Sequence, residues 1–104
     1  MVQKVVFLKS AMSDLENIYF FISSDSEFQA EKFVTLLTDE AFKIGKIPEG
    51  GGTVKEICNP NIRQRLFKKY RIIYLLKKQR IEILTFHHSS MLLHNNPHLK
   101  DYLK

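Results

Sequence analysis

The chain has 104 residues, of which 44% are hydrophobic and 26% charged, a balance that fits one globular domain and excludes wholesale disorder. The longest apolar run, Ile72 to Leu76, is too short to cross a membrane, and the N-terminal run VVFL is too short for a signal peptide. The formal net charge of +5 is uneven, because residues 53–80 hold nine Lys and Arg against one acid, Glu56. This basic segment predicts a partner that carries phosphates or acidic side chains.

The N-terminal residues predict a strand followed by a helix. Residues 2–8 are rich in valine and end at a polar pair, which indicates a strand. Ser10 is expected to cap the next helix, since its hydroxyl can accept a free backbone N–H. Apolar residues at helical spacing then run from Ala11 to Ile22.

A second helix is predicted after the polar break SSDS. Ser26 with Gln29 has the form of a capping box, and the apolar stripe from Ala30 to Ile44 has a period of 3.6 residues. Gly45 is expected to end this helix in a left-handed conformation. The two helices form an αα-hairpin, and we expect its aromatic side chains to lie in the core: Phe20, Phe21, Phe28, Phe33 and Phe42.

The C-terminal half predicts a sheet. The segment IPEGGG lacks the Lys–Ser/Thr pair of a phosphate-binding loop, so we interpret it as a flexible connection. Residues 63–67, 70–76 and 80–87 are separated by short polar turns, which favours an antiparallel meander. The remaining residues predict a short helix up to Asn95 and a loose tail after Pro97, so residues 94–104 are the loosest part of one domain, 1–104.

The fold class is therefore α+β: an N-terminal strand, an αα-hairpin packed on one face of a three-stranded meander, and a short C-terminal helix or tail. We expect the other face of the sheet, or one end of it, to be partly open. Cys58, the only cysteine, cannot form an internal disulfide, which suits a reducing cytoplasm, and it is expected to be a small buried residue.

Arg71 lies within the otherwise apolar strand 70–76. A buried guanidinium without a partner is costly, so Arg71 must reach solvent or meet an acceptor: Glu56, Glu82, a backbone carbonyl, or the phosphate of a partner. A meander is expected to bring four side chains together as donors for phosphate or carboxylate, namely Arg63, Arg65, Arg71 and His88. Lys55 is added to this list of candidate binding residues. The simpler alternative is that Arg71 pairs with an acid and only stabilises the sheet.

The stretch KIPEGGGTVKEICNPNIRQRLFKKYRIIYLLKKQRIEILTFHH resembles the C-terminal half of the ParE/RelE toxin superfamily, most closely its ParE branch. The N-terminal stretches SAMSDLENIYFFI and QAEKFVTLL are similar to the two helices of that family. The positions that carry the resemblance are Pro48, Glu49, Gly51, Glu56, Ile62, Arg63, Tyr70, Arg71, Ile73, Tyr74, Ile83, Leu84 and His88.

This resemblance implies the toxin of a type II toxin–antitoxin module, a small cytoplasmic protein that is neutralised by a cognate antitoxin. The implied assemblies are a homodimer or a toxin–antitoxin heterotetramer. We expect no membrane partner, cofactor or metal. ParE-like members are associated with poisoning DNA gyrase. RelE-like members cut messenger RNA on the ribosome. A third alternative is an inactive module that only binds its antitoxin.

For the ribonuclease alternative, the resemblance implies Glu56 as the base, Arg71 as the phosphate clamp and His88 as the acid. For the ParE branch, an arginine is usual shortly after the histidine of the last strand, whereas this chain has Ser89, Ser90 and Met91 there. The resemblance therefore leaves the activity of this chain open.

Overall fold

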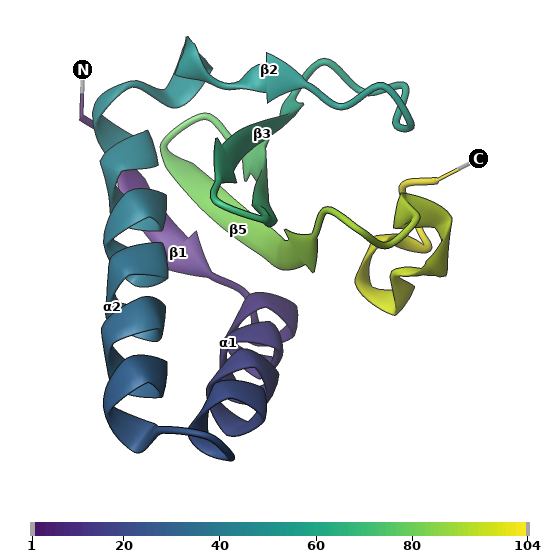
Figure 1. Ribbon diagram of the computed structural model, residues 1–104. Coiled ribbons are helices and arrows are strands. Elements are labelled where there is room, and N and C mark those ends of the chain that lie inside the picture. The colour runs from purple at the N-terminus through teal and green to yellow at the C-terminus, as the bar shows by residue number, and fades with distance from the viewer. Residues whose placement is uncertain (1, 104) are drawn as a thin grey trace.

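The computed structural model describes residues 2–103. Figure 1 shows the two helices side by side, with the sheet packed against them. The C-terminal segment, residues 89–103, lies on the far side of the sheet. No helix within residues 2–103 is long and apolar enough to cross a membrane. The helices and strands, in chain order, are β1 Lys4–Phe7, α1 Lys9–Ser23, α2 Glu27–Lys43, β2 Gly52–Thr53, β3 Ile62–Phe67, β4 Tyr70–Leu76 and β5 Arg80–His88, with single 3₁₀ turns at Ile44–Lys46, Pro48–Gly50, Leu93–Asn95 and Pro97–Leu99.

The strands form one sheet in the order β1-β5-β4-β3-β2. The meander β3–β4–β5 is antiparallel, as predicted, and β1 joins its edge parallel to β5, with Lys4 opposite Arg80. The sequence predicted neither this parallel pairing nor the short strand β2. A parallel neighbour needs a long connection, and the helical hairpin and the meander together supply it.

The helical hairpin covers one face of the sheet. Alternate residues of β4 and β5 pack against α1 and α2, because side chains on a strand point to opposite faces in turn. This core contains Ala11, Ile18, Leu37, Ala41, Ile44, Ile72, Tyr74, Ile81, Ile83 and Phe86. The fold class predicted from the sequence is confirmed.

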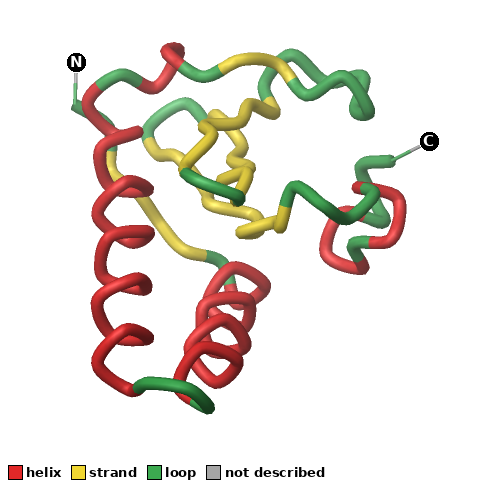
Figure 2. Tube along the Cα trace, viewed as in Figure 1, coloured by secondary structure: helices red, strands yellow, loops and turns green. Residues whose placement is uncertain are grey.

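The opposite face of the sheet is covered by the β2–β3 loop and the C-terminal segment. Val54 and Ile57 from the loop pack with Leu93 and Leu99 over the sheet, in a second core that also holds Ile62, Ile73 and Leu84. Leu99 is fully buried, so the expectation of a loose tail after Pro97 is wrong. Figure 2 shows the two single turns that replace the expected C-terminal helix. Burying a leucine stabilises the fold by about 1.5–3 kcal/mol, which outweighs the entropy of ordering its side chain.

Two local predictions at helix ends are corrected. Helix α1 begins at Lys9 after Leu8, and the hydroxyl of Ser10 instead donates to the backbone oxygen of Leu84, 2.5 Å away. Gly45 does not adopt a left-handed conformation. It lies in a 3₁₀ turn against β1, where a Cβ would approach the backbone oxygen of Gln3 to 2.5 Å. Ser26 is confirmed as the N-cap, since its side chain accepts from the backbone N–H of Gln29, but the backbone N–H of Ser26 donates to Ile22 and does not complete the expected capping box.

Candidate functional site

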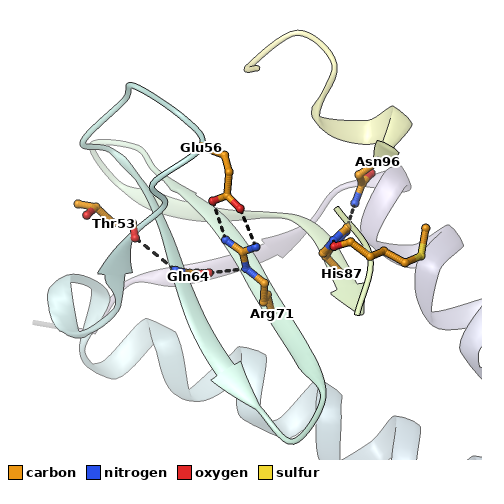
Figure 3. A network of polar contacts seen from close by, with 7 residues as sticks. Thr53, Glu56, Gln64, Arg71, His87 and Asn96 are labelled. Atoms are coloured by element: carbon orange, nitrogen blue, oxygen red, sulfur yellow. Dashed lines mark hydrogen bonds and ion pairs between the residues drawn. The ribbon is translucent and has the colours of Figure 1, made fainter. Parts of the chain in front are cut away.

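The guanidinium of Arg71 lies on the face of the sheet away from the helices, bound to two neighbouring side chains (Figure 3). Its two terminal nitrogens donate to the two carboxylate oxygens of Glu56 over 3.2 and 3.1 Å, and Nε donates to Oε1 of Gln64 over 2.6 Å. Of the acceptors that the sequence allowed, the structure selects Glu56. A bidentate arginine–carboxylate pair is among the stronger polar contacts in proteins.

The Arg71–Glu56 pair is partly open to solvent. The side chain of Arg71 is 15% exposed and that of Glu56 is 32% exposed. The hydrogen bond from Arg71 lowers the pKa of Glu56 below its usual value of 4.5, against the opposing effect of burial. Arg71 is therefore neutralised internally, without being covered by the helices. An incoming anion would have to displace Glu56.

The other two arginines of the predicted cluster lie on the helix side of the sheet. In β3, Arg63 is opposite Tyr74 and Arg65 is opposite Ile72, whereas Leu66 is opposite Arg71. Arg65 donates to Glu40 of α2 over 2.9 Å. The expectation of one arginine cluster is wrong because successive side chains on a strand alternate between its faces.

Arg63 and Arg65 both have partners within the chain. Arg63 donates to the backbone oxygens of Pro60 and Gly51, over 2.8 and 3.1 Å. Hydrogen bonds from Lys43 and then from Arg65 lower the pKa of Glu40. These side chains connect β3 to the β2 region and to α2.

The structure does not bring His88 to Arg71 and Glu56. His88 is opposite Tyr70 in the sheet, on the helix side, and the two rings meet edge to face with centroids 5.1 Å apart. The backbone N–H of Ser90 donates to Nδ1 of His88 over 3.2 Å, so the neutral ring carries its proton on Nε2. The three residues named for a ribonuclease thus lie on two faces.

The histidine on the face of Arg71 is His87, which sequence reasoning did not select. It is opposite Arg71 in the register but only 3% exposed. The amide of Asn96 donates to its Nδ1 over 2.9 Å, which leaves Nε2–H to donate to the backbone oxygen of Met91 at 2.8 Å. Both ring nitrogens of His87 are therefore occupied by the C-terminal segment, and Figure 3 shows the contact with Asn96.

A cavity of about 360 Å³, lined by both apolar and polar side chains, lies between α1, the end of β5 and the C-terminal segment. Asp14 accepts hydrogen bonds from the hydroxyl of Thr85 and the backbone N–H of Phe86, and its other oxygen lies 3.2 Å from Nε2 of His98. Sequence reasoning missed this network, in which Asp14 is 70 or more residues away in the chain from each of its partners. Its only sequence signal was a polar residue, Thr85, inside an apolar strand.

Two further predicted residues, Lys55 and Cys58, lie on the surface. Lys55 is exposed beside Glu56 and remains a candidate binding residue. Cys58 is also exposed, so the expectation that it would be buried is wrong. The loop that carries both residues is held by its apolar side chains Val54 and Ile57. Within residues 2–103, no group of three or more His, Cys, Asp or Glu side chains could hold a metal ion.

The helical hairpin exposes apolar side chains that were expected in the core. Phe21 is 81% exposed, and Phe20, Phe28 and Phe42 are also largely exposed, whereas Phe33 is half-buried. A groove of about 440 Å³ runs between α1 and α2 and is lined by Phe7, Met12, Leu15, Glu16, Tyr19, Val34, Thr38 and Phe42. Continuous exposed apolar surface of this kind marks a site for a protein partner in many soluble proteins.

The arrangement of a helical hairpin on a mixed five-stranded sheet is similar to the fold of chains from two toxin–antitoxin systems of known structure. A chain of the chromosomal ParDE system from P. aeruginosa superimposes with a TM-score of 0.70 and 17% identity, covering 84% of this chain and 96% of that one. A chain of the RelBE2 toxin–antitoxin complex from Mycobacterium tuberculosis gives a TM-score of 0.64 and 16% identity, covering 85% and 99%.

The sequence narrows this class to one family. A family model described as the ParE toxin of the type II toxin–antitoxin system parDE matches residues 5–93. The chain therefore belongs to the ParE toxin family. A search of curated proteins finds no match.

Proposed function

We propose that this ParE-family toxin acts on DNA gyrase when it is free and is neutralised by a cognate antitoxin that occupies the groove between α1 and α2. The observation that carries the proposal is the ParE family match over residues 5–93. A gyrase poison needs a binding surface but no catalytic residues. The Arg71–Glu56 pair then holds the sheet and the β2–β3 loop in place.

The separation of the candidate catalytic residues supports a poison over a ribonuclease. Metal-free RNA cleavage needs a base, an acid and a phosphate clamp within reach of one phosphodiester. His88 lies on the opposite face from Arg71, and His87 is covered by Asn96 and Met91. In addition, the carboxylate of Glu56, the intended base, is bound to Arg71.

The groove between α1 and α2 supports an antitoxin partner. Its lining is almost wholly apolar, with Met12 and Phe42 more than half exposed at its rim. An amphipathic helix of an antitoxin fits such a groove, because its apolar side chains fill the groove while its polar side stays in water. This surface differs from the arginine cluster predicted from the sequence, whose arginines lie on two faces of the sheet and are bound to partners within the chain.

The activity is tested by expression with and without the adjacent antitoxin gene, followed by two assays in vitro. We expect growth arrest that the antitoxin relieves, and double-strand breaks trapped when the toxin is incubated with gyrase and supercoiled DNA. Cleaved message on translating ribosomes, without gyrase-linked breaks, would overturn the proposal and favour the ribonuclease alternative. An absence of both activities in a chain that still binds antitoxin would identify an inactive binding module.

The antitoxin surface is tested with Met12→Glu, which places a charge at the rim of the groove. Burying a methionine contributes about 1.5–3 kcal/mol, and 1.4 kcal/mol is a factor of ten in affinity, so we expect antitoxin binding to weaken at least about tenfold. Leu66→Glu is the matched control, since Leu66 is also a large apolar side chain that is more than half exposed, but it lies on β3. Equal weakening by both variants, measured by calorimetry, would refute the assignment of the groove.

A further inference from the structure

Internal contacts engage the arginines of the basic segment, so the free positive charge of this segment lies on its lysines. Of the four arginines in the basic segment 53–80, Arg65 pairs with Glu40, Arg71 with Glu56, and Arg80 with Glu82. Arg63 is bound to backbone oxygens. The ion pairs found within residues 2–103 do not include the five lysines of the segment, which are Lys55, Lys68, Lys69, Lys77 and Lys78.

Two of these lysines meet two further cations at one tip of the sheet. Lys77 and Lys78 begin the β4–β5 turn, in which the backbone N–H of Lys77 donates to the oxygen of Arg80 over 2.9 Å. The neighbouring strand β1 begins beside this turn, with Lys4 opposite Arg80. Together with Gln79 these four cations line a hollow of about 500 Å³. Their only acidic partner within residues 2–103 is Glu82, bound to Arg80.

The composition of this basic tip (Lys4, Lys77, Lys78, Gln79 and Arg80) identifies the kind of partner. Protein interfaces are depleted in lysine and are centred on apolar or aromatic side chains, and the lining of the tip has neither. Proteins that grip single-stranded nucleic acid stack its bases on aromatic side chains, and these too are missing from the lining. The phosphodiester backbone of a duplex needs only positive charges, which bind it without reading its sequence.

We propose that the basic tip binds the phosphodiester backbone of duplex nucleic acid, independently of base sequence. Lys4, Lys77 and Lys78 supply exposed ammonium groups, and Arg80 supplies a guanidinium shared with Glu82. The tip is formed by the β4–β5 turn and the start of β1 and contains none of the residues that line the antitoxin groove. The proposal concerns free duplex and does not depend on gyrase as the target.

The test measures binding of the full chain to a labelled 20-base-pair DNA duplex by fluorescence anisotropy at several salt concentrations. Each phosphate contact contributes about 0.9 to the slope of log affinity against log salt. The slope is negative, and the double variant Lys77→Gln/Lys78→Gln should therefore make it less steep by about two. Its affinity deficit against the wild type should narrow about tenfold between 50 and 200 mM salt.

The matched control is Lys68→Gln/Lys69→Gln. This variant removes the same two charges from the β3–β4 turn, at the opposite end of β4, where the lysines adjoin Phe67 and Tyr70. We expect it to keep the wild-type slope to within about one unit. An equal loss in both variants would show that only net charge matters and would overturn the proposal.

Binding to other probes distinguishes duplex DNA from duplex RNA as the source of phosphate. It also distinguishes a duplex from a single strand and from an acidic protein. Duplex DNA and duplex RNA of equal length should both bind, and any difference between them identifies the natural source. Equal affinity for single-stranded DNA would overturn the assignment to a duplex. A poly-glutamate peptide that binds as tightly, and loses binding in Lys77→Gln/Lys78→Gln, would identify an acidic protein partner and overturn the proposal.

Discussion

The ion pair between Arg71 and Glu56 makes a sharp prediction about stability. Glu56→Gln keeps the shape of the side chain but replaces one carboxylate oxygen with an NH₂ group, which would face a guanidinium N–H now 3.1 or 3.2 Å away. Two unit charges about 4 Å apart attract by about 4 kcal/mol at an effective dielectric constant of about 20. Desolvation and the partial exposure of both side chains offset much of this, so we expect a net loss of about 1.5 kcal/mol.

This loss should lower the melting temperature by roughly 6–12 °C for a domain of this size. The control is Glu82→Gln, which breaks the Arg80–Glu82 pair, where the arginine is 52% exposed and the expected cost is below about 1 kcal/mol. Thermal melts followed by circular dichroism measure both. A loss for Glu56→Gln no larger than that for Glu82→Gln would refute the view that the Arg71–Glu56 pair stabilises the sheet.

The same pair predicts a dependence on pH. Because the pKa of Glu56 is lower in the folded protein than its usual 4.5, its contribution is fully present above that value and disappears as the pH falls through the folded pKa. The difference in stability between wild type and Glu56→Gln should therefore be constant near neutral pH and shrink under acid conditions below 4.5. Urea titrations at a series of pH values measure it. A difference that grows with acid would contradict the assigned sign.

Three further predictions concern packing. Gly51→Ala should destabilise the protein by about 1–3 kcal/mol, because its Cβ would collide with the hydroxyl of Tyr74, whereas Gly52→Ala, with no neighbour within 4 Å, should change the melting temperature little. Leu99→Ala should cost about 2–5 kcal/mol in urea denaturation, since Leu99 is fully buried, and a change under 1 kcal/mol would mean that the C-terminal segment is not part of the core. Asn96→Ala removes the amide that donates to the ring of His87 and to the hydroxyl of Thr85, and it should cost about 1–3 kcal/mol, with faster proteolysis near the C-terminus as a second readout.

Much of the local structure follows from the sequence. The apolar period of 3.6 residues, the Ser26 cap and the alternation in the last three strands predicted the helical hairpin and the meander to within a few residues. Arg71 was expected to need an acceptor, and Glu56 was among the named acceptors. These features depend mainly on residues that are close together in the chain, so short stretches of sequence are enough to predict them.

Which apolar side chains are exposed and which are buried could not be predicted in the same way. A helical stripe shows which residues share a side, but not how much of that side a neighbouring element covers. Phe20, Phe21 and Phe28 are largely exposed, whereas the predicted short helix and the predicted tail supply Leu93 and Leu99 to the second core. Burial depends on contacts between segments far apart in the chain.

The sequence by itself determined the helical hairpin, the antiparallel meander, the concentration of positive charge and the family, while the tertiary structure decided which side chains meet. The register between β4 and β5 shifts between Ile73 and Tyr74, which are opposite Thr85 and Ile83, so Leu84 is the extra residue of a bulge. Without that bulge, alternation would put His88 on the face of Arg71; with it, His87 is there, beneath Asn96. A strand has a side-chain period of two, so one inserted residue reverses every assignment beyond it, and this insertion is fixed only when the two strands pair.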